Sequence, residues 1–297
     1  MLSVVVPAYD AAPYLAAALD SVLRELPADA EVIVVDDGSR DDTPAILARY
    51  ADRVRSVRHE VARGPGIARN AGVAIARGDV LAFHDADDLV LPGRFTKLLD
   101  VLAREPSVDL VFGNGIKIYE GSERVRPVIR RAYAQRLRRR TGVSEMLLGS
   151  WIYPQALCVR SEAFRRLGGF SPGEVEDWDF GLRAVLRLSV RFVDVPVFAY
   201  RQHPGSLTTH RLEFVHLMLG MLERFVASHP DLARQVPPAE VERALARYEA
   251  RAAQQHVRSG DAAGARSLLQ RAVAHHPWSL RYRWRLVKLR LGLRPTA

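Results

Sequence analysis

Four short apolar runs, each ended by a Pro, Gly or Asp/His turn and separated by helix-like segments, constrain the fold of this chain most. The runs are Leu2–Val6, Val32–Val35, Val80–Phe83 and Val108–Phe112. Continuous runs of Val, Ile and Leu of this length are typical of strands that are buried on both faces of a parallel sheet. Strands that alternate with helices predict an open α/β sheet with right-handed crossovers.

The segments between the runs carry signals for helices. Thr43 followed by Pro44 is typical of an N-cap and a first helical position, which predicts a helix to about Ala51. The spacing of apolar residues predicts three more helices, over Pro13–Leu26, Pro65–Arg77 and Pro92–Arg104.

Composition excludes several classes of protein. The 297 residues are 48% hydrophobic and 26% charged, which is enough for one large core or two smaller ones and excludes general disorder. We find no stretch near the ~18–20 apolar residues of a membrane helix and no signal-peptide pattern, so we expect a cytoplasmic protein. The single cysteine, Cys158, excludes an internal disulfide and a cysteine-built zinc site, and we expect it to be a small buried hydrophobe.

The net charge of +9 is unevenly distributed. Residues 1–210 hold 28 Lys and Arg against 27 Asp and Glu, whereas residues 211–297 hold 15 against 7. Within the neutral part, Arg124–Arg140 contains eight arginines and no acid. This cluster is either a loop that faces an anionic glycan, lipid phosphate or pyrophosphate, or a mobile, solvated loop rich in Arg through genomic base bias.

Polar side chains follow three of the predicted strands. Tyr9 follows the first, Asp36 and Asp37 follow the second, and Asp85 and Asp87 follow the Val80–Phe83 run. Ligands bind at the carboxyl ends of strands in such sheets. An Asp at one strand end often only caps a turn, but carboxylates crowded at two ends need a cation or hydrogen-bond donors. The pattern therefore predicts a ligand site at this edge.

Six segments occur in a fixed order over roughly residues 1–205, and together they carry a family resemblance. In order and spacing they resemble the inverting family 2 glycosyltransferases of the GT-A fold, although each is weak alone. The segments are Val4–Tyr9, Glu31–Thr43, Gly64–Gly72, Gly78–Asp88, Gly168–Phe170 and Glu176–Asp179.

The resemblance implies a Rossmann-like, mostly parallel sheet flanked by helices. We expect this GT-A domain over residues 1–210, with a nucleotide-sugar half at about 1–110 and an acceptor half at about 111–210. The remaining residues, 211–297, form a basic helical extension.

By the same resemblance, Asp85-Ala86-Asp87 is the DxD motif that binds Mn²⁺ or Mg²⁺ beside a nucleotide-sugar. Asp87 would ligate the metal together with the late His203, and Asp85 would lie near the ribose. Carboxylate oxygens are ligands suited to these hard cations. Asp88 either belongs to this site or caps the helix expected near Pro92.

The resemblance also implies how the donor nucleotide is held. Pro7, Ala8 and Tyr9 would line its base and ribose, and Asp37 would accept a hydrogen bond from the base. A uracil fits, so a UDP-sugar is favoured, while a base with a similar imide or lactam edge stays open. Arg69, in the first turns of the helix from Pro65, suits the phosphates.

On the acceptor side, Asp177 matches the position of the base that takes the proton of the attacking hydroxyl. Glu176 would support this position, and Trp178 would either stack on a sugar or lie in the core. Arg201 would meet the pyrophosphate within Tyr200–Leu207, a segment that resembles the one closing such sites.

The last residues predict helices. An amphipathic helix over Arg211–His229 precedes a tetratricopeptide-like hairpin that begins at Pro238 and turns at Gly260. One such unit forms no solenoid, so it packs on the catalytic domain or mediates self-association, for example as a homodimer. The basic segment Trp278–Arg294 is either an anchor on anionic lipid at the inner membrane face or a helix docked on the hairpin with its arginines in solvent.

The resemblance implies an inverting, metal-dependent enzyme that moves a sugar from a nucleotide-sugar to a hydroxyl of a glycan or glycoconjugate, as in polysaccharide biosynthesis. Transfer to a polyprenyl phosphate at the membrane surface and non-catalytic binding of a sugar nucleotide are the alternatives. Binding of nucleic acid is disfavoured, because no recognition motif accompanies the basic charge.

Overall fold

The computed structural model describes residues 1–119, 121–173, 175–203 and 211–291. Its contacts divide the chain into two compact units, residues 1–203 and 204–297. The expected boundary at 210/211 adjoins residues 204–210, which are outside the described residues, as is Arg294.

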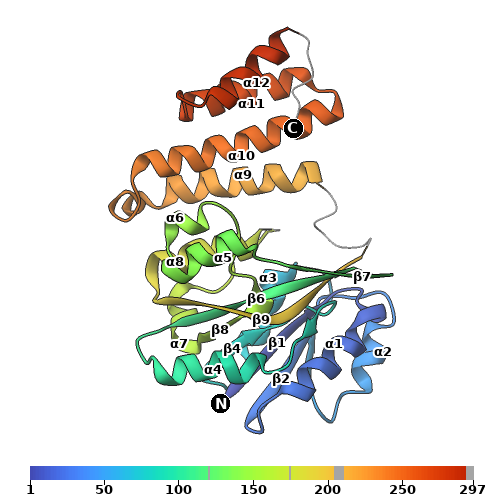
Figure 1. The fold of residues 1–297 in the computed structure, drawn as a ribbon. Coiled ribbons are helices and arrows are strands. Elements are labelled where there is room, and N and C mark those ends of the chain that lie inside the picture. Colours follow the sequence, from blue (N-terminus) through green and yellow to red (C-terminus); the bar gives the residue numbers. More distant parts are fainter. Residues whose placement is uncertain (120, 174, 204–210, 292–297) are drawn as a thin grey trace. The chain divides into compact units, whose positions relative to one another are not determined.

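Unit one is built on a single mixed sheet of nine strands among the described residues, with the order β3-β2-β1-β4-β8-β6-β9-β5 and β7 beside β6 (Figure 1). The four strands of its first half all run parallel: β1 (Leu2–Ala8), β2 (Ala30–Asp36), β3 (Arg55–Arg58) and β4 (Val80–Phe83).

The second half of the sheet reverses direction. Antiparallel β8 joins it to β4, after which β6 and β9 again run in the direction of β1, while β5 and β7 oppose them. Most strands therefore share one direction, and the predicted α/β class is confirmed. These strands are β5 (Leu89–Val90), β6 (Leu110–Tyr119), β7 (Ser122–Pro127), β8 (Leu157–Arg160) and β9 (Val190–Gln202).

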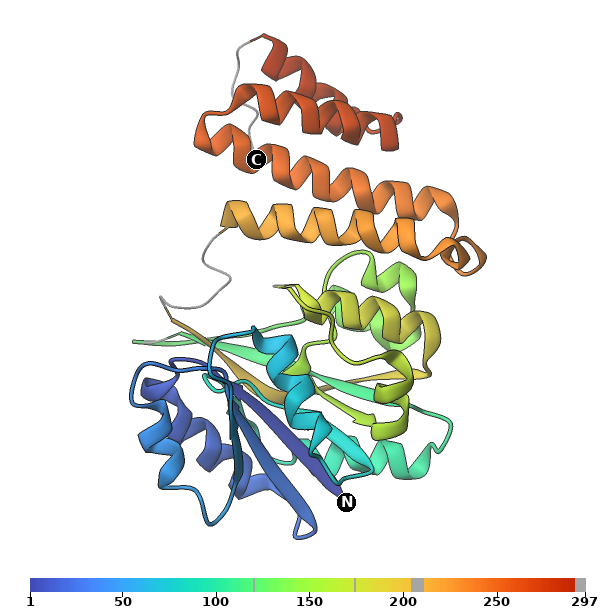
Figure 2. The ribbon, with the colours of Figure 1, turned by 180° about the vertical axis from the view of Figure 1, so that it is seen from behind.

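Helices flank the sheet. The face toward the viewer in Figure 1 carries α1 (Ala12–Glu25) and α4 (Arg94–Arg104), and the opposite face carries α3 (Pro65–Ala74; Figure 2). Strand β1 is central and its residues 4–6 are fully buried, as expected for a strand covered on both faces. The other helices are α2 (Thr43–Ala48), α5 (Arg131–Arg139), α6 (Val143–Met146), α7 (Ser161–Leu167) and α8 (Glu176–Arg187), with a 3₁₀ turn, η1, at Pro154–Ala156.

The strand register brings the predicted polar residues to one edge. Ala8 of β1 lies opposite Asp36 of β2, and Val5 of β1 lies opposite Phe83 of β4. The residues that follow these strands therefore leave the sheet at neighbouring points of the same edge.

The structure excludes two helix caps considered from the sequence, one at Thr43 and the capping alternative for Asp88. The Thr43 hydroxyl does not cap α2, because it accepts a hydrogen bond from the Ala11 amide at 2.9 Å instead. Helix α4 begins at Arg94 after Gly93, whose φ of +75° interrupts the helical backbone, so Asp88 does not cap it.

Two charged segments have regular structure. The Arg124–Arg140 cluster lies on strand β7 and helix α5 instead of a loop. The acidic motif at Glu176 and Asp177 forms the first turn of α8, where negative side chains interact favourably with the helix dipole. Cys158 is fully buried as predicted, and burial raises its pKa to about 12.

Unit two is helical, which confirms the predicted C-terminal extension. Its α10 ends at Gly260, whose φ is +84°, and the Asp261 side chain caps α11 by accepting from the Gly264 amide. None of the described helices is long and apolar enough to cross a membrane. The helices are α9 (Arg211–Ser228), α10 (Pro238–Ser259), α11 (Ala262–His275) and α12 (Leu280–Arg290), with a 3₁₀ turn, η3, at Pro230–Arg234.

Candidate active site

The DxD motif lies in the turn directly after β4, and the end of β9 brings a histidine to it. Nε2 of His203 lies 3.1 Å from Oδ2 of Asp87, across 116 residues of sequence. The His203 ring packs against Tyr14 of α1, with 4.5 Å between ring centroids. Burial and the neighbouring carboxylate of Asp85 raise the pKa of Asp87. A carboxylate and an imidazole thus face one position beside the motif.

Asp88 connects this turn to β9. It is fully buried, and its carboxylate accepts from the Gln155 side chain and from the Arg201 amide, both at 2.9 Å. Since His203 follows Arg201 by two residues, Asp88 fixes the strand end that carries the histidine. The role of Gln155 was missed from the sequence, which has no signal that pairs it with Asp88.

A buried arginine lies behind the motif. Arg94 of α4 donates to the Phe83 carbonyl at 2.6 Å, and its second terminal nitrogen lies 3.1 Å from Nδ1 of His84. Burial lowers the pKa of Arg94 to about 10 and the pKa of His84 to about 3, so at neutral pH the arginine is charged and the histidine is neutral. This positive charge lies close enough to interact with the carboxylates of Asp85 and Asp88.

Arg69 joins the donor motif to the acidic motif. Its guanidinium donates to Asp85 at 2.6 Å and to Glu176 at 2.7 Å, and only 4% of the residue is exposed. The two carboxylates raise the pKa of Arg69 against the opposing effect of burial. One side chain on α3 therefore binds residues that lie 16 positions and 107 positions away from it.

The Gly64–Gly66 turn allows this close approach. Gly64 has a φ of +91°, which favours glycine, and it precedes α3. A Cβ on Gly66 would lie 2.9 Å from Cγ of Glu176 and 2.9 Å from the Ser171 carbonyl. The absent side chain at Gly66 thus lets α3 pack directly against the acidic motif.

Asp177 follows Glu176 in the first turn of α8. Its carboxylate accepts from the Trp178 amide at 2.7 Å and from the Ser150 hydroxyl at 3.1 Å. Burial and the adjacent Glu176 together raise its pKa to about 7, against the lowering effects of these two hydrogen bonds and of Arg69. A carboxyl with this pKa exchanges a proton readily near neutral pH.

The nucleotide-side residues lie at the ends of β1 and β2. Tyr9 is 51% exposed, whereas Ala8 is buried and Pro7 is partly buried. The buried Asp37 accepts from the Arg63 and Gly64 amides at 2.9 Å and 2.8 Å, and lies 2.6 Å from Nδ1 of His59. Asp37 therefore holds the loop that leads into α3.

Two predicted residues pack against neighbouring groups of unit one. Trp178 is fully buried and donates from Nε1 to the Met146 carbonyl, so it belongs to the core and does not stack on a sugar. The guanidinium of Arg201 packs over the Tyr14 ring at 5.0 Å. Of the segment expected to close the site, residues 204–207 are outside the described residues.

Comparison with known proteins supports the family. The sequence model of the family described as "Glycosyl transferase family 2" matches residues 3–168. The chain is 31% identical over 221 residues to the "Uncharacterized glycosyltransferase EpsJ" of Bacillus subtilis (strain 168), which covers 70% of this chain and 63% of that protein. The chain belongs to glycosyl transferase family 2. It thus spans a little under two thirds of the length of this family 2 relative.

Solved structures confirm the GT-A fold of this family 2 chain. S. aureus TarS 1–349, solved in complex with UDP-GlcNAc, superposes with a TM-score of 0.64 at 17% identity, covering 98% of this chain and 92% of that TarS chain. The mannosyltransferase PcManGT of Pyrobaculum calidifontis, in complex with GDP-Man and Mn²⁺, gives a TM-score of 0.62 at 21% identity, covering 97% and 84%.

Proposed function

We propose that this chain transfers a sugar from a nucleotide-sugar to a hydroxyl acceptor, with inversion at the anomeric carbon, and that residues 1–203 carry this activity. The observation that carries the proposal is the double ion pair of Arg69, which holds Asp85 of the DxD turn and Glu176 of the acidic motif on one guanidinium. Because Asp177 adjoins Glu176, a proton acceptor lies beside the donor motif.

The donor binds at the ends of β1, β2 and β4 in this proposal. Tyr9 offers an exposed ring to the base, and Pro7 and Ala8 border it. Asp37 reads the base, or supports the site through the loop that it holds. Arg201 meets the pyrophosphate. TarS was solved with UDP-GlcNAc and PcManGT with GDP-Man, so the fold accepts either base. We favour a UDP-sugar for this chain, because a uracil fits a hydrogen bond to Asp37.

Asp87 and His203 are the residues that would hold Mn²⁺ or Mg²⁺. Their facing carboxylate and imidazole suit such an ion, and so does the crowding of Asp85 and Asp87. No group of three or more His, Cys, Asp or Glu side chains among the described residues is arranged to hold a metal unaided. A metal bound through one or two protein ligands takes its remaining ligands from water and substrate phosphates. Such an ion would stabilise the negative charge of the departing diphosphate.

Asp177 acts as the general base in this mechanism. The acceptor oxygen bonds to the anomeric carbon while the bond from that carbon to the diphosphate breaks, and the hydroxyl proton passes to the Asp177 carboxylate. Ser150 and the Trp178 amide orient the carboxylate through their hydrogen bonds. The products are the glycosylated acceptor and a nucleoside diphosphate.

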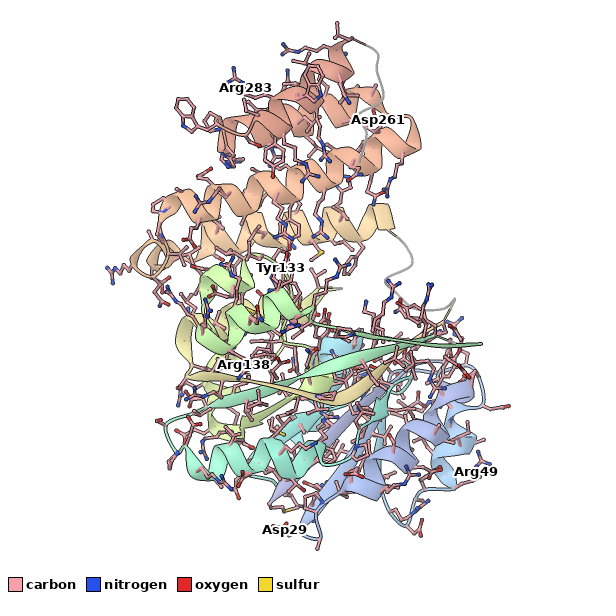
Figure 3. The ribbon with its side chains drawn as sticks, in the orientation of Figure 1. Asp29, Arg49, Tyr133, Arg138, Asp261 and Arg283 are labelled. Carbon is pink, nitrogen blue, oxygen red and sulfur yellow. The ribbon has the colours of Figure 1, made fainter. Side chains whose placement is uncertain are left out.

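The acceptor side carries aromatic and basic groups next to Ser150. Trp151 packs on Tyr133 of α5, with ring centroids 4.6 Å apart, and both rings are half-buried. Arg138, labelled in Figure 3, and the other arginines of α5 are exposed. Aromatic faces suit sugars and arginines suit anions. We propose a glycan or glycoconjugate acceptor with anionic groups, in the cytoplasm or at the inner membrane face; a polyprenyl phosphate is the alternative.

A calorimetric comparison of nucleotides tests the donor class. We expect UDP to bind, and only with Mn²⁺ or Mg²⁺ present, because the diphosphate needs the cation. GDP and dTDP, whose bases carry a similar imide or lactam edge, are compared under the same conditions. Tighter binding of GDP than of UDP would reject a UDP-sugar as the donor but would leave the proposed mechanism unchanged. Absence of binding by all three nucleotides would reject the proposed function.

The pH dependence of transfer tests the base. With a pKa of about 7, Asp177 is mostly protonated and inactive at pH 6. The rate should therefore rise with pH and level off above pH 7, being about tenfold lower at pH 6 than on the plateau. Initial rates at saturating donor and acceptor measure this. A rate that falls as the pH rises through 7 would exclude Asp177 as the base.

A further inference from the structure

Helix α12 presents an apolar stripe to solvent. Leu280, Trp284, Val287 and Leu291 are 77%, 58%, 40% and 66% exposed. Their spacing of four, three and four residues places them within about 60° of one helix face. Trp278, just before the helix, is 85% exposed. Single exposed hydrophobic residues are common, but an aligned set marks an interaction surface.

The opposite side of α12 already has its packing partner. The helix contacts α11, and Leu286, which points away from the stripe, is 8% exposed. Docking of α12 on the hairpin therefore accounts for the burial of Leu286. It does not account for the apolar residues of the stripe, which remain exposed. A second partner must cover that stripe if it is to leave water.

Positive charge flanks the stripe on both sides. Helical geometry places Arg283 and Arg290 along one flank, and Arg281 and Lys288 along the other. The Nζ atom of Lys288 lies 5.7 Å from the Trp284 ring, and the Arg283 side chain projects into solvent (Figure 3). Residues 278–291 include five basic residues and no Asp or Glu. The surface thus combines an apolar face with two cationic borders.

We propose that this stripe, with Trp278, inserts shallowly into the interface of a bilayer that contains acidic phospholipids. Long basic side chains beside a buried apolar face reach lipid phosphates, and Trp favours the interface. A second copy of the chain suits the stripe less well, because pairing two such helices would bring their cationic borders together. Charge complementarity therefore selects an anionic lipid surface.

Vesicle sedimentation tests this proposal with the full chain. We expect binding to phosphatidylcholine vesicles that contain phosphatidylglycerol, and at least about tenfold weaker binding to phosphatidylcholine alone. The double variant Leu280→Ser/Trp284→Ser should lose binding by at least about tenfold, since it removes the centre of the apolar face. Tryptophan emission of the wild type should shift to shorter wavelength on binding.

A matched charge pair separates lipid recognition from general attraction. The variant Arg283→Gln/Arg290→Gln removes two charges from the stripe border, whereas Arg258→Gln/Arg266→Gln removes two exposed charges elsewhere in unit two. Only Arg283→Gln/Arg290→Gln should markedly weaken binding to the vesicles that contain phosphatidylglycerol. Thermal unfolding of each variant checks its fold, and UDP binding, which depends on residues 1–203, should stay unchanged.

Three outcomes would overturn the proposal. The first is equal binding to vesicles with and without acidic lipid, and the second is equal binding by wild type and Leu280→Ser/Trp284→Ser. The third is sedimentation equilibrium showing a dimer that this variant abolishes, without vesicle binding by the wild type, which would assign the stripe to a second copy.

Discussion

Replacing Asp177 with Asn should lower the transfer rate by about 100- to 10,000-fold, the usual contribution of a general base, while nucleotide binding stays unchanged. The amide cannot accept the hydroxyl proton, but it keeps the shape of the carboxyl. Its oxygen can accept from the Trp178 amide, and its NH₂ group can donate to the Ser150 hydroxyl oxygen in place of the present bond. Steady-state transfer rates and calorimetry with the nucleotide measure the two effects.

Stability measurements separate this loss from misfolding. The pKa of Asp177 is raised in the folded state, so its contribution to the free energy of unfolding is fully present below the unfolded pKa of about 4 and is lost as the pH rises through about 7. Asn carries no charge to desolvate, so at pH 8 the Asp177→Asn variant should unfold at a temperature no lower than the wild type. Transfer by Asp177→Asn at the wild-type rate would exclude Asp177 as the general base. The control is Glu162→Gln, which neutralises an exposed carboxylate on α7.

Replacing Asp87 with Ala should abolish the metal-dependent part of nucleotide binding. The loss should exceed about 100-fold, because removal even of outer-shell partners of a metal often costs 10- to 100-fold in affinity. The substitution leaves His203 without its carboxylate partner, so no pair remains to hold the ion. Calorimetry with UDP, with and without Mn²⁺, measures the change.

An exposed carboxylate provides the control for this variant. Asp29 lies on the surface near the N-terminus, and Asp29→Ala removes the same charge far from the DxD turn (Figure 3). We expect it to bind UDP and Mn²⁺ as the wild type does. Equal metal-dependent binding by Asp87→Ala and the wild type would reject Asp87 as a ligand.

The first half of the fold was predictable because its signals are local. The apolar run Val80–Phe83 coincides with β4, and the runs at Leu2 and Val32 lie within β1 and β2. Each run is followed by polar residues, so the sequence alone predicts the sheet edge that carries Tyr9, Asp37 and the DxD turn.

Contacts over long sequence separations could not be predicted in this way. Gln155 reaches Asp88 only because antiparallel β8 inserts beside β4, and no spacing in the sequence indicates that pairing. Arg69 and Glu176 were each singled out, yet their ion pair depends on the packing of α3 against the start of α8 through Gly66.

The C-terminal helix illustrates a pattern that sequence alone leaves ambiguous. Basic and apolar residues alternate through α12, so either face could meet the hairpin. Burial decides the question, because Leu286 is covered while Trp284 and Leu291 are exposed. The apolar stripe is thus a property of how α12 docks, which composition does not determine.

Nucleotide release from a panel of UDP-, GDP- and dTDP-sugars is the most direct test of the transferase activity. The wild type, with water as a slow acceptor, should release nucleotide from at least one donor, and only with Mn²⁺ or Mg²⁺ present. Both Asp87→Ala and Asp177→Asn should lose this release. Release that persists in both variants, or no release from any donor, would contradict the assignment of Asp87 and Asp177 to one glycosyltransferase site.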